Sequence, residues 1–183
     1  VAGRSGRRRK VDVMKRKMRI VVRGTDWIGL WSGRFLSLFV IVMMAIILYE
    51  VVLRYFFNRP TTWALELATM IFGVYMMGGG IYALLVDGHV RMDLFYDKWS
   101  ARKKALSDVL TFPLFLAFFC LLLWKATAYG IDSFVMAEHS KTTWSPPIYP
   151  WKLSIPIIVL LMMGQGLSNF IKNLHLLITG EAL

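Results

Sequence analysis

Four long apolar stretches, separated by short polar ones, dominate the pattern of the chain. They lie at about 31–57, 63–86, 106–128 and 153–170. A helix of about 20 apolar residues crosses a hydrocarbon core of about 30 Å. The pattern therefore predicts an all-α membrane protein with four transmembrane helices.

The chain before the first apolar stretch is basic. Residues 1–10 contain Gly and a block of like charges, which is typical of a disordered tail. Residues 11–24 place apolar side chains at helical spacing among basic ones and predict an amphipathic helix on the anionic inner leaflet. We expect Gly24 to loosen its end. The residues assigned to the lipid surface are Lys15, Arg16, Lys17, Arg19 and Arg23.

Turn and helix-breaking residues delimit the remaining elements. Asn58-Arg59-Pro60 predicts a turn after the first span, and Thr61 or Thr62 can cap the next helix. Residues 129–152 contain three prolines and predict the longest loop, whereas Pro156 is acceptable in the first turn of the last helix. The membrane domain then covers 25–175, and 176–183 form a C-terminal tail.

Charge sets the expected orientation. The chain has 183 residues, 57% of them hydrophobic, and a formal net charge of +11. Residues 1–34 hold eleven Lys and Arg against two Asp. With the N-terminus inside, the inner side carries seventeen Lys and Arg and the outer side five, so both termini should be cytoplasmic.

Catalytic and metal-binding patterns are missing from the sequence. The single cysteine, Cys120, excludes an intramolecular disulfide and is expected to pack in the core. There is no phosphate loop, nucleophile elbow or paired histidine motif. We therefore expect no enzyme activity, no cofactor and no metal site. A basic tail without interleaved aromatic residues does not indicate nucleic-acid binding.

The candidate functional residues are charges near the ends of the spans. Glu50 and Arg54 are four apart and share a helix face, so they can form an ion pair that ends the first helix, or a proton or cation site. Counting twenty residues from Phe35 puts Glu50 at the outer boundary, whereas transport sites usually lie at the midplane. Glu66 is favoured by the helix macrodipole, or it bonds to a neighbouring protein.

Two further groups of residues complete the candidates. His89 and Asp93 are also four apart and either pair within a polar loop or tie that loop to a partner at the inner face. Small residues let membrane helices approach closely. The glycines expected at such contacts are Gly73, Gly78, Gly79, Gly80, Gly164 and Gly166.

These residues carry a family resemblance. The sequence E-x-x-x-R-Y-x-F-N-x-P, then W-x-x-E, then G-H-V-x-M-D resembles the small membrane subunit of tripartite ATP-independent periplasmic (TRAP) transporters, the DctQ-like family. The similarity covers about 25–175 and leaves the basic tail out. The matching positions are Glu50, Arg54, Tyr55, Phe57, Asn58, Pro60, Trp63, Glu66, His89, Val90 and Asp93.

The resemblance implies a scaffold subunit. It would brace a large, DctM-like permease while a periplasmic, DctP-like binding protein delivers an organic acid anion and the permease uses a cation gradient, usually sodium. Glu50, Arg54, Arg59, Trp63 and Glu66 would then form an outer contact network, and His89 and Asp93 an inner one. Two alternatives stay open: a homodimeric four-helix drug/proton antiporter with Glu50 as its carboxylate, and a membrane anchor of a redox enzyme.

Overall fold

Four helices make up the described part of the chain. The computed structural model describes residues 2–86 and 99–180, with α1 at Ala2–Phe56, α2 at Ala64–Leu85, α4 at Ala101–Val135 and α5 at Tyr149–Thr179. Each contains a segment long and apolar enough to cross a membrane: Val22–Phe56, Ala64–Leu85, Arg102–Val135 and Tyr149–Thr179. The predicted all-helical fold with four spans is confirmed.

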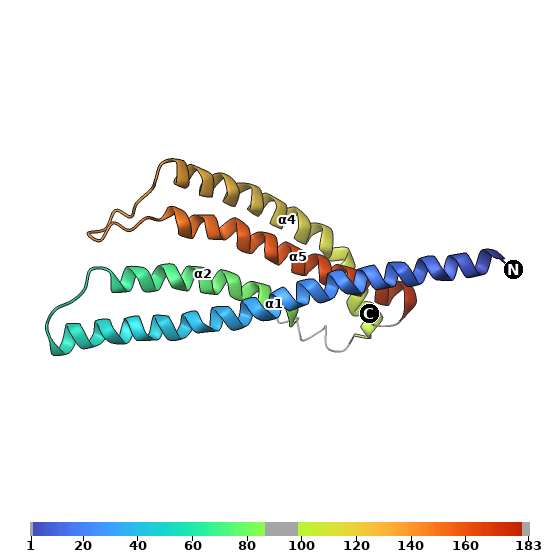
Figure 1. Ribbon diagram of the computed structural model, residues 1–183, viewed down its shortest axis with the longest axis horizontal. Coiled ribbons are helices and arrows are strands. Elements are labelled where there is room, and N and C mark those ends of the chain that lie inside the picture. The colour runs from blue at the N-terminus through green and yellow to red at the C-terminus, as the bar shows by residue number, and fades with distance from the viewer. Residues whose placement is uncertain (1, 87–98, 181–183) are drawn as a thin grey trace.

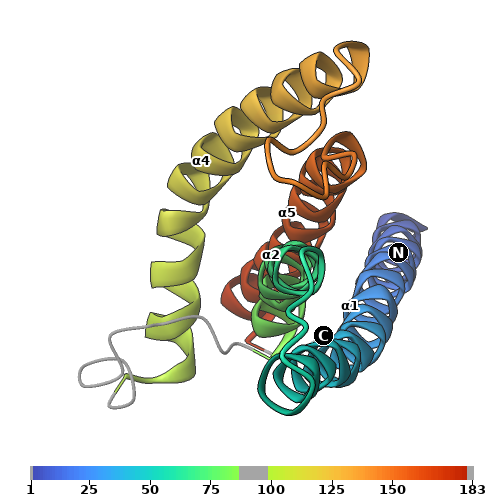
Figure 2. The same ribbon diagram turned by 90° about the vertical axis from the view of Figure 1, so that its left-hand side faces the viewer.

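The helices are arranged around α5. α1 packs against α2, α2 against α5, and α4 mainly against α5, which contacts each of the other three described helices (Figure 2). The α1–α2 and α4–α5 connections lie together at one end of the molecule, here called the loop end (Figure 1). The opposite end, where α5 finishes and α1 passes on beyond it, is called the terminal end.

Large apolar side chains cover the outside of this assembly. Met44 of α1, Leu65 of α2, Leu114 of α4 and Ile178 of α5 are each more than half exposed. In water such a surface would drive aggregation, but hydrocarbon is as apolar as these side chains. The exposed apolar surface therefore fits a chain whose helices face lipid or another membrane subunit.

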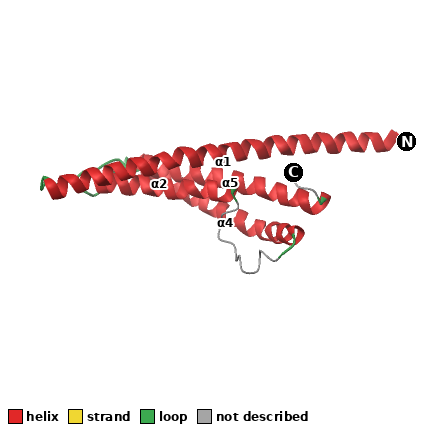
Figure 3. Cartoon of the chain, turned by 90° about the horizontal axis from the view of Figure 1, so that it is seen from below, coloured by secondary structure: helices red, strands yellow, loops and turns green. Residues whose placement is uncertain are grey.

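α1 is one continuous helix, which differs from the sequence prediction. It begins at Ala2 and passes through Gly24 without a break, so residues 2–10 of the predicted disordered tail and the separate helix predicted at 11–24 both belong to it (Figure 3). A single glycine costs a helix only about 1 kcal/mol relative to alanine, which is too little to end it.

The later helices are longer than predicted. α4 ends at Val135 and α5 begins at Tyr149, so the predicted 129–152 loop shrinks to 136–148. Pro150 lies in the first positions of α5, where a missing N–H costs nothing, and Pro156 lies inside the helix instead of in its first turn. α5 also runs into the predicted tail until Gly180 ends it with φ 73°.

One packing prediction was wrong. Cys120, expected in the core, is exposed on α4. Because α4 packs mainly on α5, a thiol on another face of α4 is not covered by the other described helices.

Candidate functional site

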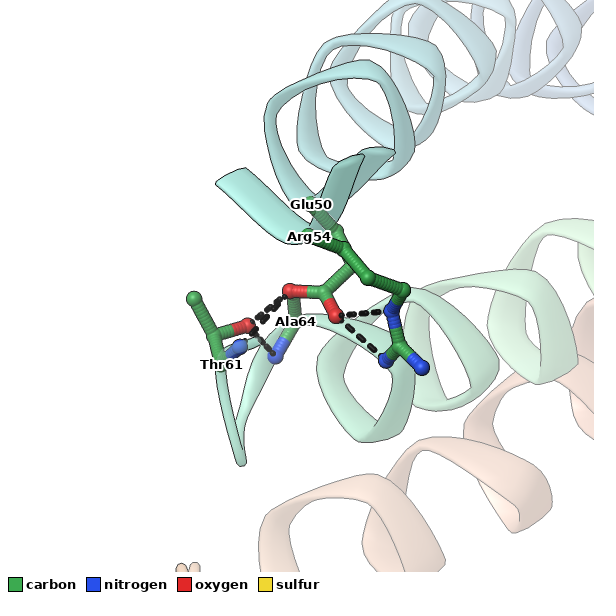
Figure 4. A network of polar contacts seen from close by, with 4 residues as sticks. All are labelled: Glu50, Arg54, Thr61 and Ala64. Carbon is green, nitrogen blue, oxygen red and sulfur yellow. Dashed lines mark hydrogen bonds and ion pairs between the residues drawn. The ribbon is translucent and has the colours of Figure 1, made fainter. Parts of the chain in front are cut away.

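At the loop end, the carboxylate of Glu50 joins α1 to the start of α2. Its Oε1 accepts hydrogen bonds from Arg54 Nε at 3.0 Å and Arg54 Nη2 at 2.5 Å (Figure 4). Its Oε2 accepts from the backbone N–H of Thr61 at 3.0 Å and from the Thr61 hydroxyl. Both oxygens are thus satisfied, which explains how a carboxylate with 7% exposure is tolerated here.

The turn between α1 and α2 delivers Thr61 to this carboxylate. Asn58 has φ 52°, in the left-handed region, and the N–H of Arg59 donates to the C=O of Leu53 at 3.0 Å. That bond closes a seven-residue loop at the end of α1, and the left-handed residue just past the helix is a common way for helices to end. Pro60 follows and cannot extend the helix. The turn predicted from Asn58-Arg59-Pro60 is confirmed.

Trp63 and Glu66 fasten α2 to its neighbours at the same end. The Trp63 ring centroid lies 6.1 Å from that of Tyr49 on α1 and 6.4 Å from that of Trp144 in the α4–α5 connection. Glu66 Oε2 accepts a hydrogen bond of 2.6 Å from the Thr142 hydroxyl. Trp63, just before α2, and Glu66 in its first turn therefore hold the 136–148 connection against the helices.

The residues predicted to form one outer contact network therefore fall into separate groups. Glu50 and Arg54 form one group, Trp63 and Glu66 belong to another, and Arg59 is exposed in the turn outside both. Of the two uses considered for Glu50, the structure has the ion pair within the chain.

A third group at this end was missed by the sequence reasoning. Glu138 Oε2 accepts hydrogen bonds from Lys152 Nζ at 2.5 Å and from the Ser133 hydroxyl at 2.7 Å, and Lys152 lies 4.0 Å from the ring centroid of Tyr129. The bonds from Lys152 and then Ser133 lower the pKa of Glu138. These residues lie on α4, the connection and α5, so sequence spacing alone gave no sign of their contact.

At the terminal end, Asp26 of α1 is bound by two residues of α5. Lys172 Nζ donates to both carboxylate oxygens, each at 2.9 Å, and Gln165 Nε2 donates to Oδ1 at 3.0 Å. The Gln165 residue is 1% exposed, whereas the Lys172 and Asp26 side chains are about one-third exposed. This charged pair ties α1 to α5 at the terminal end.

Two amides extend the same polar face of α5 toward the other helices. Asn169 Nδ2 donates to the C=O of Leu84 on α2 at 2.6 Å, and Asn173 Nδ2 donates to Asp108 Oδ2 on α4 at 2.9 Å. Positions 165, 169, 172 and 173 share one helix face. That spacing of polar residues in an apolar helix was a signal available in the sequence.

The predicted packing glycines divide equally. A Cβ atom on three of them would lie less than 3.0 Å from a side chain of another helix: Gly78, Gly80 and Gly166. A Cβ on the other three would meet nothing within 4 Å: Gly73, Gly79 and Gly164. Gly33 of α1, which was not predicted, approaches the Tyr82 ring as closely as the first group, because α1 and α2 cross there.

Several predicted residues cannot be placed. His89 and Asp93 lie outside the described residues, and so do the side chains of Lys15, Arg16 and Lys17; Arg19 and Arg23 are exposed on α1. Within residues 2–86 and 99–180, no three His, Cys, Asp or Glu side chains are grouped so that they could hold a metal ion.

The family model of the DctQ component of tripartite ATP-independent periplasmic transporters matches residues 43–176. The chain belongs to this family. The match includes the loop-end groups and most of α5, and it begins after the basic half of α1. A comparison with curated proteins gave no match. The chain is thus a multi-pass small permease component of a TRAP transporter, as its resemblance implied.

Proposed function

We propose that this DctQ component is a scaffold that braces a large, DctM-like permease in the bacterial inner membrane. A periplasmic, DctP-like protein would bring an organic acid anion, and the permease would carry it inward with a cation gradient, sodium in the usual case. The family supports the kind of partner. We propose a scaffold and not a carrier because of where the carboxylate side chains of this chain lie.

The carboxylates whose side chains the structure describes lie toward the two ends of the molecule and not in its middle. Glu50, Glu66 and Glu138 are at the loop end, and Asp26 and Asp108 are at the terminal end, each in a hydrogen bond. Asp132, near the end of α4, is at the loop end (Figure 1). A carrier that couples to cations usually places its site near the midplane, beside a broken helix. The arrangement of α1, α2, α4 and α5 supports a bracing role instead.

Exposed apolar faces supply the surface for such bracing. α4 packs mainly on α5, and its outward stripe holds Leu110, Leu114, Phe118 and Leu121, each at least 60% exposed. A large membrane subunit can pack on this stripe without losing hydration, because the stripe already faces hydrocarbon.

Capture of the partner tests the proposal. The chain, tagged after Leu183, is purified in mild detergent from its native membranes. A stoichiometric large polytopic permease is the expected companion. Recovery of self-associated chain alone would favour the antiporter alternative, and a peripheral redox protein would favour the anchor. Either of these two outcomes would overturn the proposed scaffold role.

Orientation is tested separately. The excess of Lys and Arg on the terminal side predicts cytoplasmic termini. A reporter that is active only outside the cytoplasm, fused after Leu183, should be silent. Fused within the 136–148 connection, it should be active; the reverse pattern would contradict the orientation.

A further inference from the structure

α1 continues past the other helices as a free arm. Val22 is 7% exposed, whereas Ile20 is 62% exposed. No other described helix runs beside the beginning of α1 (Figures 1 and 3). Residues 2–21 add about 30 Å of helix at 1.5 Å per residue. This arm lies outside the region that the family model matches.

The arm carries a charge that a free helix would not tolerate well. Residues 1–23 contain ten Lys and Arg against Asp12. Lys15, Arg19 and Arg23 follow one another at four-residue spacing, so like charges stack on one helix face. Most helical stability in proteins comes from packing of an amphipathic face, and no other described helix runs beside the beginning of the arm (Figures 1 and 3). An anionic surface would relieve the repulsion and stabilise the helix.

The root of the arm lies beside the membrane. Trp27 and Trp31 have ring centroids 5.8 Å apart and are both more than half exposed, next to the Asp26–Lys172 pair. Exposed tryptophans at the end of a span sit at the headgroup level. The arm therefore leaves the bundle where lipid headgroups begin.

A straight arm would hold most of its charges away from that surface. Attraction between exposed charges decays over about 8 Å at physiological ionic strength, far less than the length of the arm. To use its charge, the arm must bend near its root. Gly24 is suited to the bend, because a Cβ there would meet nothing within 4 Å, and the Thr25 hydroxyl donates to the C=O of Val22 at 3.0 Å. Glycine and hydroxyl residues of this kind are common at helix kinks.

We propose that residues 2–21 form a basic arm that turns about Gly24 and Thr25 and lies along the anionic surface of the membrane. The occupant is an anionic phospholipid surface and not a nucleic acid, because the arm starts at headgroup level and its sequence has apolar residues on one helical face. These residues are Val11, Met14, Met18 and Val21. The inference concerns this chain alone and does not depend on capture of a permease.

Fluorescence in vesicles tests the arm. Cys120 is replaced by serine, and a single cysteine carrying an environment-sensitive dye is placed at Met18, on the apolar face, or at Ile20, on the opposite face. The purified chain is reconstituted in phosphatidylcholine alone or with phosphatidylglycerol added. We expect anionic lipid to protect the Met18 label severalfold from an aqueous quencher and to leave the Ile20 label accessible. Equal protection in both lipids, or none in either, would overturn the proposal.

Two substitutions test the hinge and the charge. Gly24→Ala stiffens the proposed bend and should reduce protection at Met18, whereas Gly73→Ala, at an equally open glycine in α2, should not. Replacing Lys15, Arg16, Lys17 and Arg19 together by glutamine should remove the dependence on phosphatidylglycerol. Unchanged protection in Gly24→Ala would exclude the hinge.

Discussion

Asp26 and Lys172 stand 146 residues apart in the chain, yet the lysine ammonium donates to both oxygens of the carboxylate at 2.9 Å. The pair joins the start of the first span to the end of the last one. Gln165 adds a third bond to the same carboxylate. α1 and α5 are thereby fixed to each other at the terminal end of the molecule.

Removal of this lysine should loosen that end. Lys172→Met leaves the half-buried Asp26 without its cation, and we expect a loss of about 1–2 kcal/mol in the free energy of unfolding. Thermal unfolding in detergent measures it. The double variant Asp26→Asn/Lys172→Met should recover part of the loss, since the unpaired charge is gone. If the loss in the double variant equals the sum of the losses in Asp26→Asn and Lys172→Met, the two residues do not interact.

Glu66 should matter more for assembly than for the fold. Thr142→Val and Glu66→Ala break the same internal hydrogen bond, so their effects on thermal stability should be similar. If Glu66 also contacts the large subunit, only Glu66→Ala should lower the yield of the captured complex and uptake by cells. Equal yields from both variants would limit Glu66 to holding the 136–148 connection.

The Glu138 group should make stability fall in acid. Because the pKa of Glu138 is lowered in the folded chain, its contribution is complete above the unfolded pKa of about 4.3 and is lost as the pH falls through the lower folded value. Melting temperatures of the wild type and Glu138→Gln should therefore differ at neutral pH and converge as the pH falls below the lowered folded pKa of Glu138. A difference that persists at acid pH would contradict this assignment.

Two glycines on α5 should respond differently to the same substitution. A Cβ at Gly166 would overlap the Phe115 ring of α4, whereas one at Gly164 would meet nothing within 4 Å. Gly166→Ala should destabilise the chain by about 1–3 kcal/mol through overpacking, and Gly164→Ala should be neutral or stabilise by up to about 1 kcal/mol. Chemical or thermal unfolding of the two variants, side by side, measures the contrast.

The yield of the complex captured with the permease is a second measurement on these glycine variants. If Gly164 faces the large subunit, Gly164→Ala should lower complex yield while the isolated chain keeps its stability. Loss of both properties would place Gly164 inside the chain's own packing, in conflict with its open surroundings.

The sequence by itself determined the spans and the turn between the first two. Runs of apolar residues leave no other way to satisfy the backbone than helices in lipid, and Asn58 before Pro60 encodes a local closure that needs no distant contact. The i,i+4 spacing of Glu50 and Arg54 likewise predicted a pair that forms within one helix. The family, too, could be recognised from short motifs along the chain, and its model matches residues 43–176.

Only the tertiary structure decided which distant residues meet. A lipid-facing helix is apolar on all sides, so its hydropathy does not show which side meets another helix. The sequence therefore did not reveal that α5 packs against every other described helix. Nor did it reveal that Gly166 faces α4 while Gly164 faces outward. The partners of Asp26 and Glu138 come from other elements, and no spacing along the chain encodes them. Gly24 did not end α1, because the propensity of one residue is smaller than the cooperativity of a long helix.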